Sequence, residues 1–197
     1  GVVPDQMFRL IDRVFRTTGW NVITIKYGKR MMEAFGRPGG KALRRWISDC
    51  PNDLYAALTF RGAQAWRVQL TKDFVNDDDA LRLIESYGND ELQNLMTNLG
   101  GHCLETLMEA FDDASKDETP TCFIAYTIKG WGLPLAGHKD NHSGILNEDQ
   151  VIGFRDKLGI KPGQEWDAFA GIEDHAPKLT QFLQNVTFNR DGRRRFS

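Results

Sequence analysis

The stretch that most constrains this chain is residues 121–144, TCFIAYTIKGWGLPLAGHKDNHSG. Its first part, TCFIAYTI, is an apolar run rich in β-branched and aromatic side chains and bounded by turn residues, which predicts a buried strand. A glycine-rich loop follows and contains His138 and His142. In open α/β sheets, ligands bind beyond the carboxyl ends of the strands. We therefore expect Lys129, the loop and both histidines to lie where such sheets carry their chemistry.

A second strand is predicted for the run WNVITIKYG, which stops at a Tyr-Gly pair. Residues 29–99 show helical spacing in several short pieces, and another helix is expected to open at Gly100-Gly101-His102. Strand, helices and strand in this order imply a crossover connection, so the two strands are expected to be parallel in one sheet. A two-stranded parallel sheet does not form a stable domain alone. Together with the start at Gly1 rather than Met, this predicts a piece of something longer.

Capping and turn residues mark the expected helix starts. They are Pro4 with Asp5, Asn76 or Asp77, Asn89, Asn147, and Pro177. The apolar residues of segment 104–114 follow helical spacing, which predicts a helix with an apolar stripe. The aspartates at 77–79 could also suggest a metal site, but adjacent carboxylates do not face one another on a helix, so capping is the preferred interpretation.

Composition excludes several classes of protein. Hydrophobic residues make up 41% and charged residues 26%, as in ordinary globular domains, and the net charge of −2 gives no reason to expect nucleic acid or a membrane surface. No stretch approaches the ~20 apolar residues of a membrane span, and no signal peptide is visible. Cys103 and Cys122 fall in apolar segments and are expected to be small buried side chains of a reducing compartment. The cytoplasm is therefore the expected location.

Lys129 follows the predicted strand directly and is next to Gly130. Glycine allows the backbone to approach an anion closely, and a Lys supplies a compact positive charge for phosphate. The segment is not a P-loop, which would need Gly-x-x-x-x-Gly-Lys-Ser/Thr before a helix. On spacing alone, a solvated surface Lys is the alternative interpretation.

His138 and His142 are four residues apart, the spacing that places two metal ligands on one helix face. The glycines and polar residues around them disfavour a helix, and no third ligand is evident, so this spacing does not indicate a metal site. A histidine in a glycine-bounded loop suits a charge stabiliser, a proton shuttle or a lid residue. The alternative is an exposed loop histidine without function. His102 is a third candidate, expected in a partly buried turn.

Four segments carry a resemblance to a known family: GWNVITIKYG, LGGHCLETLMEAF, TIKGWG and GHKDNHSG. In this order they resemble the thiamine-diphosphate-binding domain of homodimeric 2-oxoacid dehydrogenases. The decarboxylating component of the bacterial pyruvate dehydrogenase complex is similar in particular, and transketolase more distantly. The similarity covers roughly residues 5–160, which is more specific than any one motif. It implies a three-layer α/β fold with a parallel sheet and many helices, and a homodimer that holds each cofactor between two chains.

Carried over by position, the resemblance implies that Lys129 and Gly130 lie near the diphosphate of the cofactor. It implies that His142 belongs to the active-site loop, where it contacts the bound cofactor and substrate and helps to stabilise charge. His138 is the second catalytic candidate. His138 and the preceding LPLAG depart from the pyruvate dehydrogenase pattern, so the substrate stays open between pyruvate, 2-oxobutyrate and another 2-oxoacid. Transketolases lack a Lys at the position of Lys129, which favours the dehydrogenase branch. The ligands of the accompanying Mg²⁺ are implied upstream of Gly1.

The resemblance divides the chain into two parts. Residues 1–160 would be the C-terminal part of a thiamine-diphosphate-binding domain, and residues 161–197 a helical tail and basic linker toward a second domain. The parent enzyme would decarboxylate a 2-oxoacid oxidatively and pass the acyl group to a lipoyl-bearing acyltransferase, whereas the isolated chain would be inactive. Two alternatives stay open: ketol transfer of the transketolase type, and a non-catalytic fragment or dimerisation module.

Overall fold

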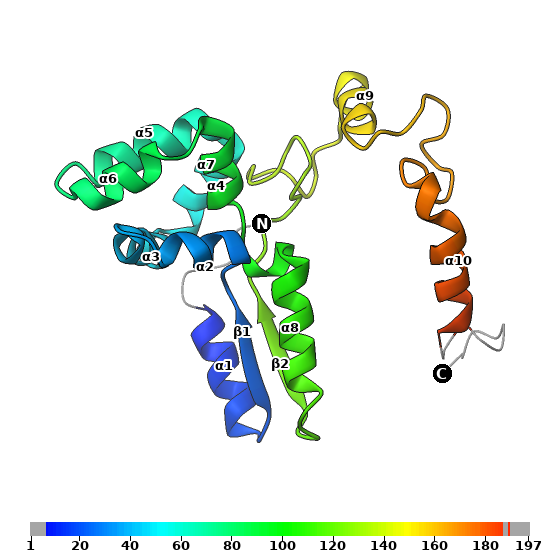
Figure 1. Ribbon diagram of the computed structural model, residues 1–197, viewed down its shortest axis with the longest axis horizontal. Helices are drawn as coiled ribbons and strands as arrows, with labels where there is room; N and C mark the ends of the chain where they lie inside the picture. Colours follow the sequence, from blue (N-terminus) through cyan, green and yellow to red (C-terminus); the bar gives the residue numbers. More distant parts are fainter. Residues whose placement is uncertain (1–6, 187–188, 190–197) are drawn as a thin grey trace. The chain divides into compact units, whose positions relative to one another are not determined.

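A computed structural model gives the structure of residues 7–186 and 189 (Figure 1). The predicted helix start at Pro4 and Asp5 and the basic end (residues 190–197) lie outside these described residues. The chain divides into two compact units between Gly144 and Ile145, and each unit is described by itself.

The first unit contains a parallel pair of strands, β1 (Asn21–Ile25) and β2 (Thr121–Ala125). Asn21 lies opposite Thr121 and Ile25 opposite Ala125, which confirms the predicted parallel pairing. Helices α1 (Met7–Thr17) and α8 (Leu104–Ala114) flank the two strands (Figure 1). The α/β class is therefore confirmed, with a two-stranded parallel sheet in the described part of the chain.

The prediction that TCFIAYTI forms a buried strand is wrong in two respects. The strand ends at Ala125: the Tyr126 N–H still donates to the Ile25 carbonyl over 3.0 Å, but residues 126–128 are not part of the strand. None of the side chains of β2 is fully buried, whereas Val22 and Ile25 of β1 are. The physical reason for the difference in burial is that the flanking helices α1 and α8 both pack more against β1 than against β2.

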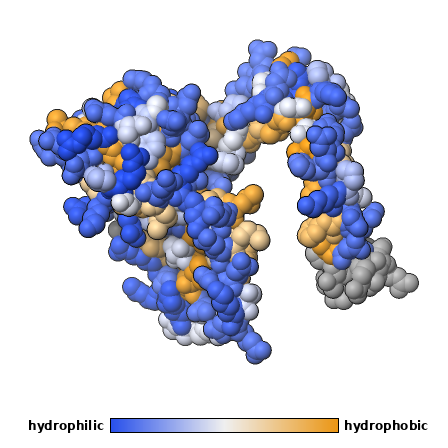
Figure 2. Space-filling model, in the orientation of Figure 1, coloured by the Kyte–Doolittle hydropathy of each residue, from blue (hydrophilic) through white to orange (hydrophobic). Residues whose placement is uncertain are grey.

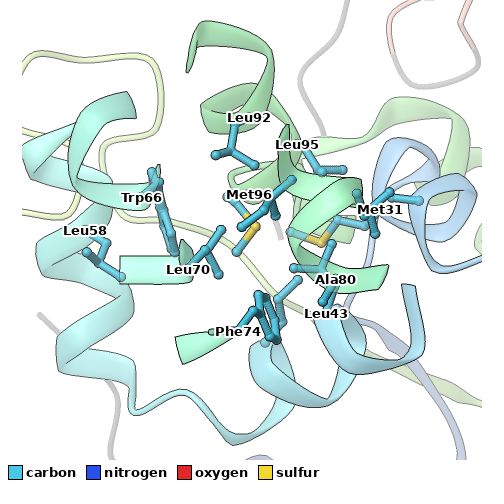
Figure 3. Packing of buried hydrophobic residues seen from close by; sticks show 14 of the residues in the cluster. Met31, Leu43, Leu58, Trp66, Leu70, Phe74, Ala80, Leu92, Leu95 and Met96 are labelled. Carbon is cyan, nitrogen blue, oxygen red and sulfur yellow. The ribbon is translucent and has the colours of Figure 1, made fainter. Parts of the chain in front are cut away.

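Six helices between the strands form the main hydrophobic core of the first unit, as the helical spacing of residues 29–99 predicts. They are α2 (Lys29–Phe35), α3 (Gly40–Asp49), α4 (Asn52–Arg61), α5 (Ala63–Asp73), α6 (Asp78–Glu85) and α7 (Asn89–Met96). Their fully buried side chains include Met31, Leu43, Trp66, Leu70, Leu92 and Met96, which converge in Figure 3. Apolar packing therefore holds this helical layer together.

The capping predictions have mixed outcomes. Asp77 Oδ1 accepts a hydrogen bond of 2.9 Å from the Ala80 N–H, which confirms Asp77 as the cap of α6. The prediction that Asn89 caps α7 is wrong, because Gly88 occupies the N-cap. The Glu91 carboxylate accepts the Gly88 N–H, while the side chain of Asn89 accepts from Arg67 instead.

The apolar stripe that the spacing predicts for α8 is largely exposed. Leu104 is 78% exposed, and Met108 and Phe111 are exposed as well; Ala110 is the one buried residue of this helix. Hydrophobic patches reach the surface around the strands and their flanking helices in Figure 2. Helical spacing establishes that an apolar face exists, but it does not establish what covers that face.

The second unit contains α9 (Glu148–Lys157) and α10 (Ala176–Asn185), and the latter follows a short 3₁₀ turn, η2 (Glu173–His175). Asn147 caps α9 as predicted: its Oδ1 accepts the Gln150 N–H, and Gln150 Oε1 accepts the Asn147 N–H. No side chain of residues 145–186 is fully buried. Across the described chain, no helix has the length and apolar character that crossing a membrane requires.

Candidate cofactor site at the carboxyl ends of the two strands

The carboxyl ends of β1 and β2 are joined by a tight turn, η1 (Gly100–His102). The Gly100 N–H donates to the Lys26 carbonyl over 3.0 Å, and the Gly101 N–H donates to the Tyr126 carbonyl over 2.9 Å. A Cβ on either glycine would lie within 2.7 Å of atoms at the strand ends, so no larger residue fits there. The turn therefore fixes how the two strand ends lie relative to each other.

Lys129 stands just beyond β2, at the start of the glycine-rich loop. The preceding Ile128 is buried at 8% exposure, whereas the Lys129 side chain is exposed. Gly130 then turns the chain with a φ of 71°. The Lys129 carbonyl accepts from the Asn141 side-chain amide over 2.5 Å and from the Gly137 N–H over 3.5 Å. A free ammonium group thus projects beside a loop whose two ends are tied together.

The loop also packs against the helical layer through α4. A Cβ on Gly137 would lie 2.4 Å from the Ala56 carbonyl oxygen, so the loop backbone lies directly on that helix. The His138 ring lies 4.5 Å from the Phe60 ring between centroids. His138 Nδ1 also accepts the Asp140 N–H over 3.1 Å. These contacts hold the middle of the loop, and they leave His138 half-buried.

His142 is exposed, and neither histidine lies on a helix. Asn141, the residue before His142, is hydrogen-bonded to the Lys129 carbonyl, so the structure brings these two parts of the loop together. His138 instead contacts Phe60 of α4. Among the described residues no group of three His, Cys, Asp or Glu side chains is arranged to hold a metal ion.

His102 has a role that its sequence position did not reveal. Its Nε2 accepts a hydrogen bond of 2.6 Å from the Ile128 N–H, and its ring stacks on Trp131 with centroids 4.7 Å apart and planes 12° apart. Burial lowers the pKa of His102, which favours the neutral ring that can accept this bond. The signal available in the sequence was the histidine after Gly100-Gly101, but its partners lie more than twenty residues away.

Cys103 and Cys122 are half-buried free thiols, which corrects the prediction that they are buried. Cys103 Sγ accepts the Lys29 N–H over 3.5 Å. Burial by itself would raise the pKa of Cys103, but hydrogen bonds from the Lys29 amide and from Thr106 lower it overall. Cys103 is the N-cap residue of α8, and its thiol accepts hydrogen bonds from the Lys29 amide and from Thr106.

The fold and site define an α/β domain with a cationic side chain and a tied loop beyond parallel strands. The sequence pattern of the family described as "Transketolase, thiamine diphosphate binding domain" matches residues 68–187, and the chain belongs to this family. The match includes TIKGWG, GHKDNHSG and LGGHCLETLMEAF, and it confirms the resemblance that these segments predicted.

Two kinds of enzyme are similar to this chain. The pyruvate dehydrogenase E1 component of Corynebacterium glutamicum is 30% identical over 76% of this chain, and that of Cupriavidus necator is 25% identical over the same share. Transketolase 1 of Vibrio vulnificus is 30% identical over 53% of this chain. The chain spans 16% of the length of the two E1 components and 17% of that transketolase.

The described residues fit one end of thiamine diphosphate. An exposed Lys suits an anionic diphosphate, because its compact ammonium charge is accessible from solvent. The Mg²⁺ that accompanies a diphosphate prefers carboxylate and carbonyl oxygens. The described residues contain no group of three His, Cys, Asp or Glu side chains that could hold this ion.

Proposed function

We propose that this chain is part of the cofactor domain of a thiamine-diphosphate-dependent 2-oxoacid dehydrogenase of the pyruvate dehydrogenase type. The observation that carries the proposal is the exposed Lys129 at the carboxyl end of the parallel pair, in a loop tied back to its own start. The relatives named pyruvate dehydrogenase E1 component align over more of the chain than the transketolases do. In this proposal residues 1–160 belong to the cofactor domain, and residues 161–197 lead toward a second domain.

Each side chain has a proposed part in that site. Lys129 pairs with the diphosphate, and Gly130 lets the backbone approach it. His142 is exposed on the loop and free to stabilise charge on the reacting 2-oxoacid. His138 is the second candidate: the Asp140 N–H occupies its Nδ1 and fixes the ring, which leaves Nε2 to exchange a proton.

The chemistry that bound thiamine diphosphate supplies is nucleophilic attack on the 2-oxo carbon and stabilisation of the charge left when CO₂ departs. The residues of this chain bind and orient the diphosphate, and the loop excludes water around the substrate. The proposed partners are a second copy of the enzyme, which completes the site, and a lipoyl-bearing acyltransferase, which receives the acyl group.

The substrate test uses the enzyme that contains this chain, with thiamine diphosphate and Mg²⁺ supplied. CO₂ release would be measured with pyruvate and with 2-oxobutyrate, and ketol transfer with a ketose phosphate and an aldose phosphate acceptor. The proposal expects turnover of at least one 2-oxoacid and negligible ketol transfer. Ketol transfer without 2-oxoacid turnover would contradict it.

Transketolase-type ketol transfer is the second candidate function. The 30% identity to Transketolase 1 of Vibrio vulnificus favours it, although over a smaller share of the chain. The Lys at position 129 argues against it, because the resemblance implies that transketolases lack a Lys there. The remaining alternative is a non-catalytic module. It predicts that calorimetry detects no binding of thiamine diphosphate by the protein that contains this chain.

A further inference from the structure

His102 holds a backbone amide that the sheet leaves unpaired. β2 ends at Ala125, so the Ile128 N–H has no partner strand. Ile128 is buried at 8% exposure, where an unpaired N–H would be costly. The Nε2 of His102 accepts this N–H over 2.6 Å, which places the acceptor on a turn that is itself fixed to both strand ends.

The same ring supports the next turn of the loop. Its face stacks on the Trp131 indole with planes 12° apart. Lys129 and Gly130 lie between the two contacts, so His102 holds the chain on either side of them. The Trp131 N–H also donates to the Ile128 carbonyl over 3.0 Å, which closes the turn. A shift of the ring would therefore move the backbone that carries Lys129.

We propose that His102 is a positioning residue of the cofactor site, which acts through the Ile128 amide and the Trp131 ring to aim Lys129 at the diphosphate. This inference rests on the proposed function, since it assigns Lys129 to the diphosphate. His102 itself contacts neither cofactor nor substrate in this account. It requires a neutral imidazole with the proton on Nδ1, because Nε2 must accept.

Two substitutions separate the hydrogen bond from the stack. His102→Gln keeps an acceptor at the reach of Nε2 and loses the ring, whereas His102→Phe keeps a ring against Trp131 and loses the acceptor. Both would be made in the enzyme that contains this chain, together with Lys129→Ala. The readouts are hydrogen exchange of peptides that cover Ile128, and the KM for thiamine diphosphate against kcat at saturating cofactor.

The expected result is that His102→Phe speeds exchange at Ile128 and raises the cofactor KM, each by about tenfold, with little change in kcat. His102→Gln should rescue most of both effects. The inference alone would be overturned if His102→Gln and His102→Phe changed exchange and cofactor KM equally. It would also be overturned if His102→Phe kept a normal KM for thiamine diphosphate while Lys129→Ala weakened binding. An unchanged cofactor KM in Lys129→Ala would instead overturn the proposed site and the inference with it.

Discussion

The side-chain amide of Asn141 donates a hydrogen bond of 2.5 Å to the backbone carbonyl of Lys129. It links the start of the glycine-rich loop to the residue before His142. Asn141 Oδ1 is buried and has no hydrogen-bond partner among the described residues. The positions of Lys129 and His142 are therefore coupled through one side chain, although His142 itself is exposed.

Replacing Asn141 by Asp should loosen the loop. The variant keeps the shape of the side chain but loses its N–H donor. It also places a carboxylate against the Lys129 carbonyl oxygen, which should destabilise the loop by about 1–3 kcal/mol. Limited proteolysis within residues 129–144 should be faster than in the wild type. Asn94→Asp, at an exposed helix position, is the control that makes the same charge change. Equal proteolysis of both variants would show that the Asn141 bond does not hold the loop.

Gly137→Ala should detach the loop from α4. The new Cβ would lie 2.4 Å from the Ala56 carbonyl oxygen, at a residue whose φ is 77°. Gly132→Ala is the matched control, because its φ is 83° but a Cβ there meets nothing within 4 Å. Both carry the left-handed penalty of about 1–2 kcal/mol, and Gly137→Ala carries the clash in addition. Quenching of loop tryptophan fluorescence by iodide should rise in Gly137→Ala and stay near wild type in Gly132→Ala; the reverse order would refute the contact.

Two Leu→Ala variants should separate the core from the exposed stripe. Leu70→Ala removes a fully buried side chain of the helical layer and should lower the free energy of unfolding by about 2–5 kcal/mol. Leu104 is 78% exposed, so Leu104→Ala should change the free energy of unfolding by less than about 0.5 kcal/mol. Urea unfolding of the 197-residue chain measures both. A large loss in Leu104→Ala would mean that the α8 stripe is covered in solution.

The His102 contact should weaken in acid. The pKa of His102 is lowered in the folded chain by burial, so the unfolded chain binds the proton more readily. The stabilising contribution is therefore fully present above the unfolded pKa of about 6.5 and is lost as the pH falls from there toward the lower folded pKa. The stability difference between wild type and His102→Gln should shrink between pH 7.5 and pH 5. A difference that grows in acid would contradict the assigned neutral ring.

Much of the first unit follows from local sequence. The apolar runs predict both strands, and the crossover between them predicts their parallel pairing, which the register confirms. Asp77 and Asn147 cap their helices as predicted, because short polar side chains satisfy helix N–H groups locally. The end of β2 and the exposure of α8 were not predictable, because both depend on what lies beside them rather than on their own spacing.

The candidate site was predictable only in outline. The position of Lys129 beyond a strand follows from order along the chain, and so does the glycine-rich loop. The His102–Ile128 hydrogen bond and the His138–Phe60 contact join residues far apart in sequence, so no spacing rule could indicate them. Both contacts depend on the conformation of the loop, and helical or strand periodicity carries no information about loop conformation.

The most direct test of the account is a calorimetric titration of thiamine diphosphate, with Mg²⁺ present, into the enzyme that contains this chain. Lys129→Ala would be compared with Lys139→Ala, an exposed Lys of the same loop whose side chain is 84% exposed. We predict that Lys129→Ala weakens binding by about tenfold or more, while Lys139→Ala stays within about twofold of wild type. Equal affinities for the two variants would contradict the placement of the diphosphate at Lys129.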